Sequence, residues 1–188
     1  MEKKVKIFAF GGSLRKDSYT AHILKGLAEF IPNDAVLDTF EPSDLGKLPH
    51  FNQDDDMSQP ESVKNFKERV KAADAIIIVT PEYNYSVPSL IKNAIEWGSR
   101  PYGDNSFDGK TAAIVSSSIG MLGGSRAQYH LRQIMTFLGL QAVQKPEVMI
   151  PFIQDKLGQD GKIKDEETKK HIRDIVSALV ILTQKLSA

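Results

Sequence analysis

The sequence predicts an α/β protein with three layers, in which a doubly wound, five-stranded parallel sheet lies between helices. Short apolar runs alternate with amphipathic helical patterns along the chain, as they do in repeated strand–helix units. The run 75–79, "AIIIV", is apolar at every position, which is typical of a strand covered by helices on both faces. A chain of 188 residues is most simply one domain, spanning 1–188, and is large enough to bury a full core.

Each strand of this sheet is expected where an apolar run falls between polar segments. The predicted strands are Val5–Phe10, Ala35–Phe40, Ala75–Thr80, Thr111–Ser116 and a last one across Gln141–Met149. Between them, apolar residues three or four positions apart predict helices. These stripes are Ile23, Leu24, Leu27 and Ile31; Val63, Phe66, Val70 and Ala73; Leu90, Ile91, Ala94 and Ile95; Leu131, Ile134, Met135 and Leu138; and Ile172, Ile175, Val176, Leu179 and Leu186.

The polar segments between these elements are predicted to be loops. Two of them, 50–57 and 155–167, are rich in charged residues. The aspartates at 54, 55 and 56 lack the spacing of a calcium-binding loop, so we expect them to be solvated.

The composition excludes several partners and chemistries. Lys plus Arg and Asp plus Glu number 24 each, so no net charge favours nucleic acid or an acidic membrane surface. The chain has no cysteine, which removes disulfides, thiolate nucleophiles and cysteine-based metal sites. No stretch is apolar for long enough to span a bilayer, and the N-terminus has no signal-peptide pattern. We therefore expect a cytoplasmic protein without a metal centre.

The segment after the first strand, "GGSLRKDSYT", is predicted to bind a phosphate group. In an open α/β sheet the ligand lies at the carboxyl ends of the strands, where the strand order reverses. Ser18 is a natural N-cap, so the amides of Tyr19 and Thr20 would open a helix and form an anion site. The Ser13 and Thr20 hydroxyls and the Arg15 guanidinium would add donors. A capped helix with an exposed arginine would show the same residues, so that alternative stays open.

Other known loops do not fit this segment. A dinucleotide fingerprint starting at Gly11 needs glycines where the chain has Ser13 and Lys16, and a P-loop needs glycine and lysine where it has Lys16 and Asp17. An esterase needs an aspartate three residues before its histidine, which none of the four histidines has. The later "GGSRA" has Ala127 where a nucleophile elbow needs glycine. The first strand also ends without the acidic residues of a receiver domain. A loop that holds a single phosphate remains.

The segment after the third strand offers a wall for a flat aromatic ligand. Pro81 ends the strand, and Glu82, Tyr83, Asn84 and Tyr85 then bring two tyrosines and several amides to the same sheet edge. Aromatic rings can cover one face of such a ligand, and backbone groups can hold its polar edge. The alternative is that the tyrosines merely pack onto the domain.

A third polar segment, 115–128, follows the fourth strand. Ser117 and Ser118 offer hydroxyls, and Gly120, Gly123 and Gly124 would let the backbone approach a ligand closely. A flexible, glycine-rich turn into the next helix explains these glycines nearly as well. The three loops together favour a ligand site more than any one of them does.

The segments "GSLRKDS", "PEYNYSVPSLIKNAIEW" and "SSSIGMLGGSRAQYHLRQ" resemble the NAD(P)H-dependent FMN reductase family, and in particular its bacterial quinone and chromate reductase branch. The resemblance runs from about Val5 to the last helix and implies a flavodoxin-like fold with strand order 2-1-3-4-5. It implies FMN as cofactor and NAD(P)H as co-substrate. The residues that it implies for the cofactor are Ser13, Arg15, Ser18, Tyr19 and Thr20 at the phosphate, Pro81, Glu82, Tyr83, Asn84 and Tyr85 around the isoalloxazine, and Ser117 near the ribityl chain or ring edge.

The function implied by this resemblance is hydride transfer from NAD(P)H, through FMN, to a quinone or another small acceptor such as free flavin, an azo dye or chromate. A ping-pong order is expected, and no catalytic side chain is named, because the cofactor carries the chemistry. A flavodoxin-like electron carrier and a flavin-binding redox sensor without turnover remain alternatives. Strongly acidic charge is typical of carriers, and this chain lacks it. Arg126 and Tyr129, three apart on one helical face, predict a homodimer or a homotetramer.

Overall fold

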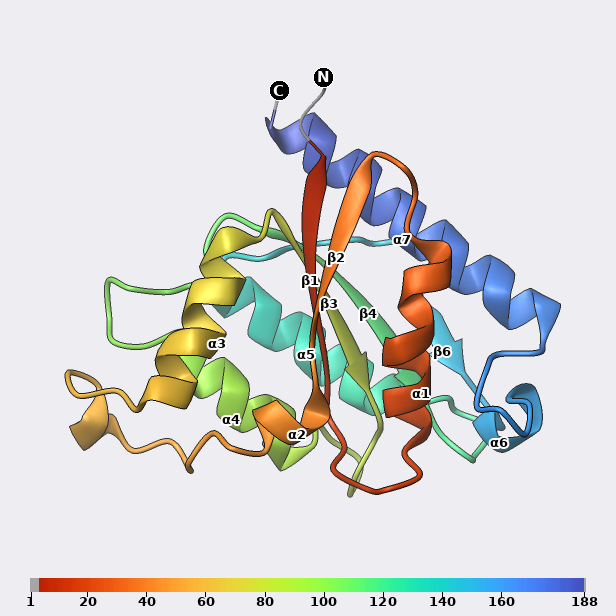
Figure 1. Ribbon diagram of the computed structural model, residues 1–188, viewed down its shortest axis with the longest axis horizontal. Coiled ribbons are helices and arrows are strands. Elements are labelled where there is room, and N and C mark those ends of the chain that lie inside the picture. Colours follow the sequence, from red (N-terminus) through yellow and green to blue (C-terminus); the bar gives the residue numbers. More distant parts are fainter. Residues whose placement is uncertain (1–3, 188) are drawn as a thin grey trace.

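A parallel sheet lies between two layers of helices in the computed structural model, which describes residues 4–187 (Figure 1). The strands are β1 (Val5–Gly11), β2 (Ala35–Phe40), β3 (Ala75–Thr80), β4 (Thr111–Ser117), β5 (Gln141–Ala142) and β6 (Val148–Ile150). Their order is β2-β1-β3-β4-β5, and all of the ladders are parallel. The predicted doubly wound sheet and its strand order are therefore confirmed.

The last predicted strand is divided into two short ones. Both pair with β4: Thr111 stands opposite Gln141 in β5, and Ser117 stands opposite Ile150 in β6. The segment between them leaves the ladder and contains Pro146, which has no amide hydrogen to donate. The prediction of one continuous strand over Gln141–Met149 was wrong for this physical reason. β1 and β4 each run one residue further than predicted.

The helices divide between the two faces of the sheet. They are α1 (Tyr19–Gly26), α2 (Pro42–Leu45), α3 (Glu61–Ala72), α4 (Ser89–Gly98), α5 (Ser125–Leu138), α6 (Ile153–Lys156) and α7 (Glu166–Ser187), with 3-10 turns η1 (Leu27–Phe30) and η2 (Gln53–Asp55). Helices α1 and α7 cover one face, and α3, α4 and α5 cover the other (Figure 1). The predicted apolar stripes face the sheet, except that Leu186 is 58% exposed. Within residues 4–187, no helix has both the length and the apolar character needed to cross a membrane.

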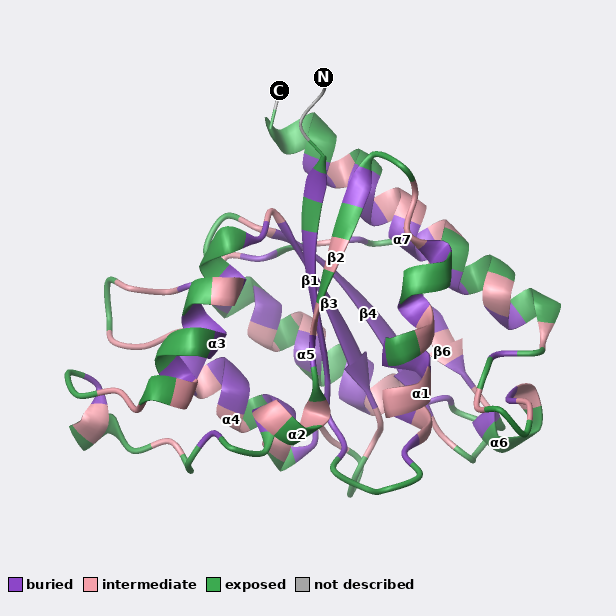
Figure 2. Ribbon diagram, in the orientation of Figure 1, coloured by how far each residue is buried: buried purple, intermediate pink, exposed green. Residues whose placement is uncertain are grey.

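Each face of the sheet has its own core because successive strand residues point to opposite sides. In β3, Ala75, Ile77 and Val79 pack beneath α1 and α7, whereas Ile76 and Ile78 pack beneath the other three long helices. Strands β3 and β4 are consequently buried along their whole length (Figure 2). This explains the continuous apolar run that predicted a doubly covered strand.

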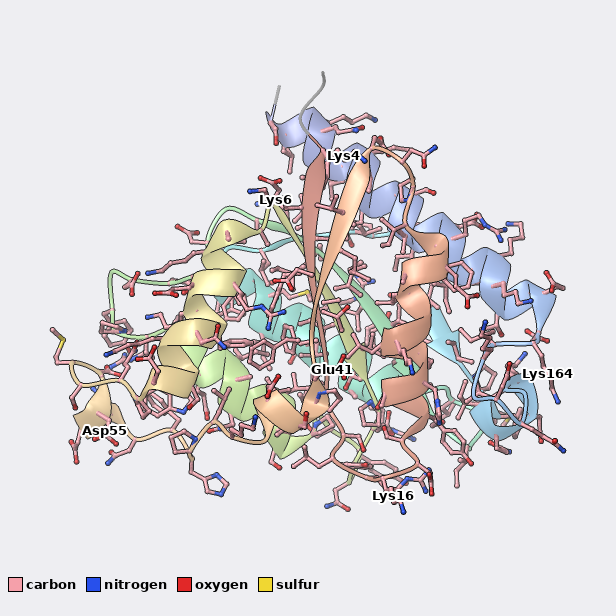
Figure 3. The ribbon with its side chains drawn as sticks, viewed as in Figure 1. Lys4, Lys6, Lys16, Glu41, Asp55 and Lys164 are labelled. Carbon is pink, nitrogen blue, oxygen red and sulfur yellow. The ribbon has the colours of Figure 1, made fainter. Side chains whose placement is uncertain are left out.

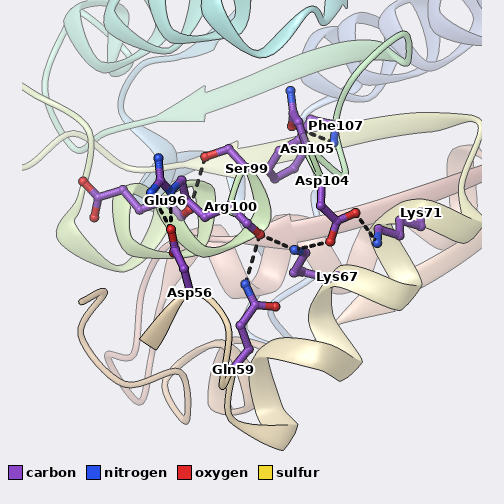
Figure 4. Close-up of polar contacts among 10 residues, drawn as sticks. All are labelled: Asp56, Gln59, Lys67, Lys71, Glu96, Ser99, Arg100, Asp104, Asn105 and Phe107. Carbon is purple, nitrogen blue, oxygen red and sulfur yellow. Dashed lines mark hydrogen bonds and ion pairs between the residues drawn. The ribbon is translucent and has the colours of Figure 1, made fainter. Parts of the chain in front are cut away.

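The loop containing the three aspartates is held to the domain by a buried ion pair. Asp56 is buried and accepts hydrogen bonds from Nε (2.9 Å) and Nη2 of Arg100, which follows α4 (Figure 4). The prediction of solvation was therefore wrong for Asp56, because Arg100 lies far away in the sequence. Within residues 4–187 no group of carboxylates and histidines has the arrangement of a metal site.

Next to this ion pair, the buried Lys67 of α3 holds the segment that connects α4 to β4. The Lys67 ammonium group donates to the Arg100 carbonyl and to Asp104 (2.7 Å), and Lys71 pairs with the other oxygen of Asp104 (2.5 Å) (Figure 4). These two lysines hold the pKa of Asp104 below its ordinary value. A charge as deeply buried as Lys67 requires such partners, so the network is structural.

The start of α7 is stabilised by Asp165, in the segment predicted to be a polar loop. Its carboxylate accepts hydrogen bonds from the Thr168 hydroxyl (2.6 Å) and amide (2.8 Å), and Lys156 lies 3.1 Å away. These contacts lower the pKa of Asp165 to about 2. The same segment also buries Leu157 and Ile163. It is therefore more ordered than its polar composition predicts.

We expect Asp165 to contribute to the acid limb of the stability curve. Its pKa is depressed in the folded protein, so its contribution is present above its ordinary pKa of 3.8 and is lost as the pH falls toward about 2. The difference in melting temperature between wild type and Asp165→Asn should shrink as the pH is lowered through this range. Thermal unfolding followed by circular dichroism measures this difference. A difference that stays constant would contradict the expectation.

Candidate functional site

The loops that follow β1, β3 and β4 meet at the carboxyl edge of the sheet, where the strand order reverses. Figure 3 shows Lys16 and Glu41 at this edge, whereas Lys4 and Lys6 lie at the opposite edge. Between the loops is a cavity of about 290 Å³. The residues that line it are Ser13, Arg15, Ser18, Tyr19, Thr20, Pro81, Glu82, Tyr83, Ser117, Ser118, Ile119 and Ile153. Nine of the eleven residues predicted for the cofactor are in this lining, and the two others, Asn84 and Tyr85, are not.

One end of the cavity has the donors of an anion site. Ser18 is the N-cap of α1, and its hydroxyl accepts a hydrogen bond from the Ala21 amide (3.2 Å) and contacts the Thr20 hydroxyl (2.9 Å). The amides of Tyr19 and Thr20 precede the first amide that donates within the helix, which is that of His22 to the Ser18 carbonyl (3.1 Å), and are therefore available to a ligand. The helix dipole adds a partial positive charge at the same place.

Arg15 supplies the full positive charge at this end. Its guanidinium donates to the Asp17 carbonyl and lies over the Tyr19 ring, 5.0 Å from the ring centre. Both contacts hold the arginine back over its own loop, where it lines the cavity. The five residues predicted to bind the phosphate thus line one cavity in the structure. Their role toward a ligand stays a prediction.

Gly12 lets this loop pass close to the neighbouring helix. A Cβ at this position would lie 2.3 Å from Cδ1 of Ile91 in α4. The Gly12 amide also donates to the Val79 carbonyl (3.1 Å), which continues the β1–β3 ladder by one residue. The glycine therefore fixes the path from β1 into the anion site.

The loop after β3 ends in a tight β-hairpin. Tyr83 and Ser86 exchange backbone hydrogen bonds of 3.1 and 2.9 Å, and the two residues between them are both left-handed. Asn84 has φ 48° and Tyr85 has φ 63°, which is the geometry of a type I′ turn. Tyrosine in this region is strained. The turn therefore needs contacts outside itself, and the sequence alone gave no indication of this conformation.

The two tyrosines of this hairpin have different surroundings. The Tyr83 hydroxyl lies 3.1 Å from Oγ of Ser13 and so joins the second loop to the anion site. Tyr85 is 68% exposed, outside the cavity, and its ring lies under the Arg126 guanidinium at 4.0 Å. Tyr83 thus lines the cavity and Tyr85 does not, and the role of either tyrosine toward the ring stays a prediction.

Glu82 lines the cavity, but its carboxylate is bound to α5. Oε2 accepts hydrogen bonds from the amides of Arg126 (2.9 Å) and Ala127 (3.3 Å), and Oε1 accepts one from Nη1 of Arg126 (3.2 Å). The resemblance implied that Glu82 helps to frame the isoalloxazine, and that role stays a prediction.

The third loop adds residues that the sequence prediction did not include among the cofactor contacts. Ser118 and Ile119 directly follow Ser117 and line the cavity with it. Ile153, in α6, reaches the same cavity because its amide donates to the Ser118 carbonyl (3.1 Å) and the Ser118 amide donates to Ile150 (3.1 Å). Proximity to Ser117 could have indicated the first two. Nothing in the sequence indicates Ile153, whose position depends on the pairing of β6 with β4.

The glycines of the third loop serve packing. Gly123 has φ +57°, and a Cβ there would lie 2.7 Å from the carbonyl carbon of Met149. Gly124 has φ +82°, caps α5 and lies against Ser116. At these two positions, close contacts within the fold therefore account for the glycine.

We therefore expect Gly123→Ala to destabilise the protein by roughly 1–3 kcal/mol, because the left-handed backbone and the Met149 backbone leave no room for a methyl group. Gly120→Ala is the matched control, since the one atom near its added Cβ is Oγ of Ser118 at 3.8 Å. Urea unfolding of both variants measures the difference. Equal losses of unfolding free energy in the two variants would contradict this account.

These residues fit FMN at both of its ends. The amides of α1, the three buried hydroxyls of Ser13, Ser18 and Thr20, and Arg15 suit a dianionic phosphate. Pro81, Tyr83 and Ile119 offer apolar and aromatic surface for a flat ring system, and the buried Ser117 offers a hydroxyl beside it.

Outside the cavity, α5 carries a polar cluster with the hairpin and with the segment before β6. Tyr129 donates to Glu147 (3.3 Å), Arg132 pairs with Glu147 (3.4 Å), and Nδ1 of His130 lies 2.9 Å from the Ser86 hydroxyl. Tyr129 is 51% exposed. This surface contains the residue pair that predicted self-association.

Comparisons with known proteins agree with this geometry. The sequence profile of the family described as NADPH-dependent FMN reductase matches residues 5–155. The chain is 38% identical to a 2-hydroxy-1,4-benzoquinone reductase of a Burkholderia species, over 90% of this chain and 91% of that protein. It is 37% identical to an NAD(P)H-dependent FMN reductase of Pseudomonas aeruginosa, over 99% of both.

Among solved structures, the flavoenzyme FerB, an NAD(P)H:(acceptor) oxidoreductase from Paracoccus denitrificans, superposes with a TM-score of 0.87 at 36% identity, covering 96% of this chain and 98% of that one. Family profile, relatives and superposition all extend over the three loops that build the cavity. The chain therefore belongs to the NADPH-dependent FMN reductase family and is an oxidoreductase.

Proposed function

We propose that this protein binds FMN in the cavity at the carboxyl edge of the sheet and transfers electrons from NAD(P)H to quinones. The observation that carries the proposal is that the anion-binding start of α1 and the Tyr83 wall line one cavity. Relatives named as a benzoquinone reductase and as an FMN reductase support the same activity. Free flavins, azo dyes and chromate are further acceptors that an open site of this kind could serve.

The anion site holds the cofactor in place. In this proposal Ser13, Arg15, Ser18, Tyr19 and Thr20 bind the phosphate through hydroxyls, amides and one guanidinium. The Ser18 N-cap holds the amides of α1, and Gly12 fixes the path of the loop that carries the other donors. Little reorganisation of the protein is therefore needed on binding.

At the other end, Pro81, Glu82, Tyr83, Asn84, Tyr85 and Ser117 form or support the ring wall. FMN, when bound, supplies the chemistry of accepting hydride from NAD(P)H and passing electrons to an acceptor. Tyr83 and Ile119 are 49% and 65% exposed, so this end of the cavity is open to solvent. A donor and an acceptor would use the same opening in turn, which is a ping-pong order.

Steady-state turnover tests this proposal. Purified protein should be yellow and should oxidise NADPH or NADH when benzoquinone is added, with parallel lines in double-reciprocal plots at several benzoquinone concentrations. Bound FMN without turnover would favour the electron carrier or the redox sensor. A colourless protein that does not bind added FMN would contradict the cofactor assignment.

We also propose a homodimer, with a homotetramer as the larger assembly, formed through the surface that holds Arg126 and Tyr129. Both residue types are enriched at interfaces. Tyr85, whose ring lies under Arg126, and Met121, in the loop before α5, are 68% and 70% exposed and add apolar area. Sedimentation at micromolar protein concentration should give a dimer or tetramer, and Tyr129→Ala should shift it toward monomer. A monomeric wild type would remove this proposal.

The single domain over 1–188 and the cytoplasmic location stay predictions.

A further inference from the structure

Glu82 connects the loop after β3 to the start of α5, because its carboxylate is hydrogen-bonded to that helix. The side chain is 11% exposed, and both of its oxygens accept hydrogen bonds from the first residues of α5. A mostly buried carboxylate that has three donors is committed to those donors, since losing them would leave a poorly compensated charge.

Helix α5 depends on this carboxylate for its start. Its N-cap is Gly124, which has no side chain to accept a hydrogen bond from the first amides. Glu82, from the loop after β3, accepts hydrogen bonds from the amides of Arg126 and Ala127 in place of a local cap. Its negative charge also lies at the positive end of the helix dipole. A residue 44 positions away thus performs a capping role.

The same carboxylate orients Arg126 toward the hairpin. The Arg126 guanidinium is paired with Glu82 at 3.2 Å and covers the Tyr85 ring at 4.0 Å. Tyr85 is one of the two left-handed residues of the type I′ turn, and the strain of that turn requires outside contacts. Arg126 supplies one of them, and His130 supplies another through Ser86.

The hairpin in turn fixes Tyr83, whose hydroxyl meets Ser13 in the anion site. We propose that Glu82 is a positioning residue that acts through Arg126 and the start of α5 to hold the Tyr83 wall in place for the flavin ring. This inference rests on the proposed function. In this inference the Glu82 carboxylate does not contact the ring. Its hydrogen bonds to α5 instead join the loop after β3 to the loop after β4, and this connection fixes the part of the cavity that would hold the ring.

The test measures binding of FMN and of riboflavin, which lacks the phosphate. Glu82→Ala should weaken both ligands by the same factor, about tenfold, because the ring wall contacts the part that they share. Glu82→Gln keeps an oxygen for the α5 amides and loses the ion pair, so we expect an intermediate loss of about threefold. If the alanine variant does not fold, the glutamine variant alone decides.

The matched control is Asp38→Asn. Asp38, on β2, pairs with Arg69, and that guanidinium covers the Phe40 ring at 4.8 Å, so the chemistry is the same but the place is remote from the cavity. We expect this variant to lose stability without losing affinity. The double variant Glu82→Ala with Arg126→Ala should lose less affinity than the two single losses combined, because both residues act in one chain of contacts.

Unchanged affinity in both Glu82 variants would overturn the inference, as would a loss confined to FMN or an equal loss in Asp38→Asn. These outcomes require that wild type binds FMN. A wild-type protein that does not bind it instead contradicts the proposed function, so the two failures are distinguishable.

Discussion

Replacing Arg15 and Ser18 together by alanine should weaken FMN binding by about 2–4 kcal/mol, roughly 30-fold to 1000-fold, while riboflavin affinity changes much less. Arg15 supplies the charge-assisted contact, and the Ser18 hydroxyl both caps α1 and lies in the cavity. Only FMN has the phosphate that these donors would meet. Isothermal titration of the two ligands into the apoprotein measures the difference.

The control for this experiment is Lys16→Ala, which removes a neighbouring positive charge that does not line the cavity. It should change FMN affinity far less than the double variant does. Equal weakening of FMN and riboflavin in the double variant would show that Arg15 and Ser18 do not meet the phosphate. Because Ser18 also caps α1, urea unfolding of the apoprotein should be compared alongside.

Phe66→Ala should destabilise the fold by about 3–5 kcal/mol, the largest expected effect on stability. Phe66 lies in α3, is fully buried, and contacts four other aromatic rings: Phe8, Phe10, Phe40 and Phe107, with ring centres 5.3–6.5 Å away. Truncation would leave a cavity among rigid rings on strands β1 and β2, which cannot collapse to fill it. Urea unfolding followed by fluorescence of the single tryptophan measures the loss.

Phe137→Ala is the matched control, because Phe137 is 79% exposed on α5. It should change the unfolding free energy by no more than about 0.5 kcal/mol. A loss below about 1 kcal/mol in Phe66→Ala would mean that the aromatic cluster repacks around the vacancy, in contrast to the close packing described above.

Much of the fold could be predicted from the sequence because its signals are local. Residues 75–79 are apolar throughout because both faces of β3 are covered, and the helical stripes follow the buried sides of α3, α4 and α5. The division of the last strand was missed, since it depends on where β4 offers partners on either side of the segment containing Pro146. Asp56 was missed for a similar reason, because its partner Arg100 is 44 residues away.

The site shows the same division. The Ser18 cap and its amides are a local feature, and the sequence alone determined that the loop after β1 has the residues of an anion site beside a tyrosine-bearing segment. Only the tertiary structure decided that Glu82 binds α5, that Tyr85 leaves the cavity while Tyr83 meets Ser13, and that Ile153 enters it. The physical reason is that these positions depend on hydrogen bonds and ring contacts between segments tens of residues apart, which neither periodicity nor motif spacing records.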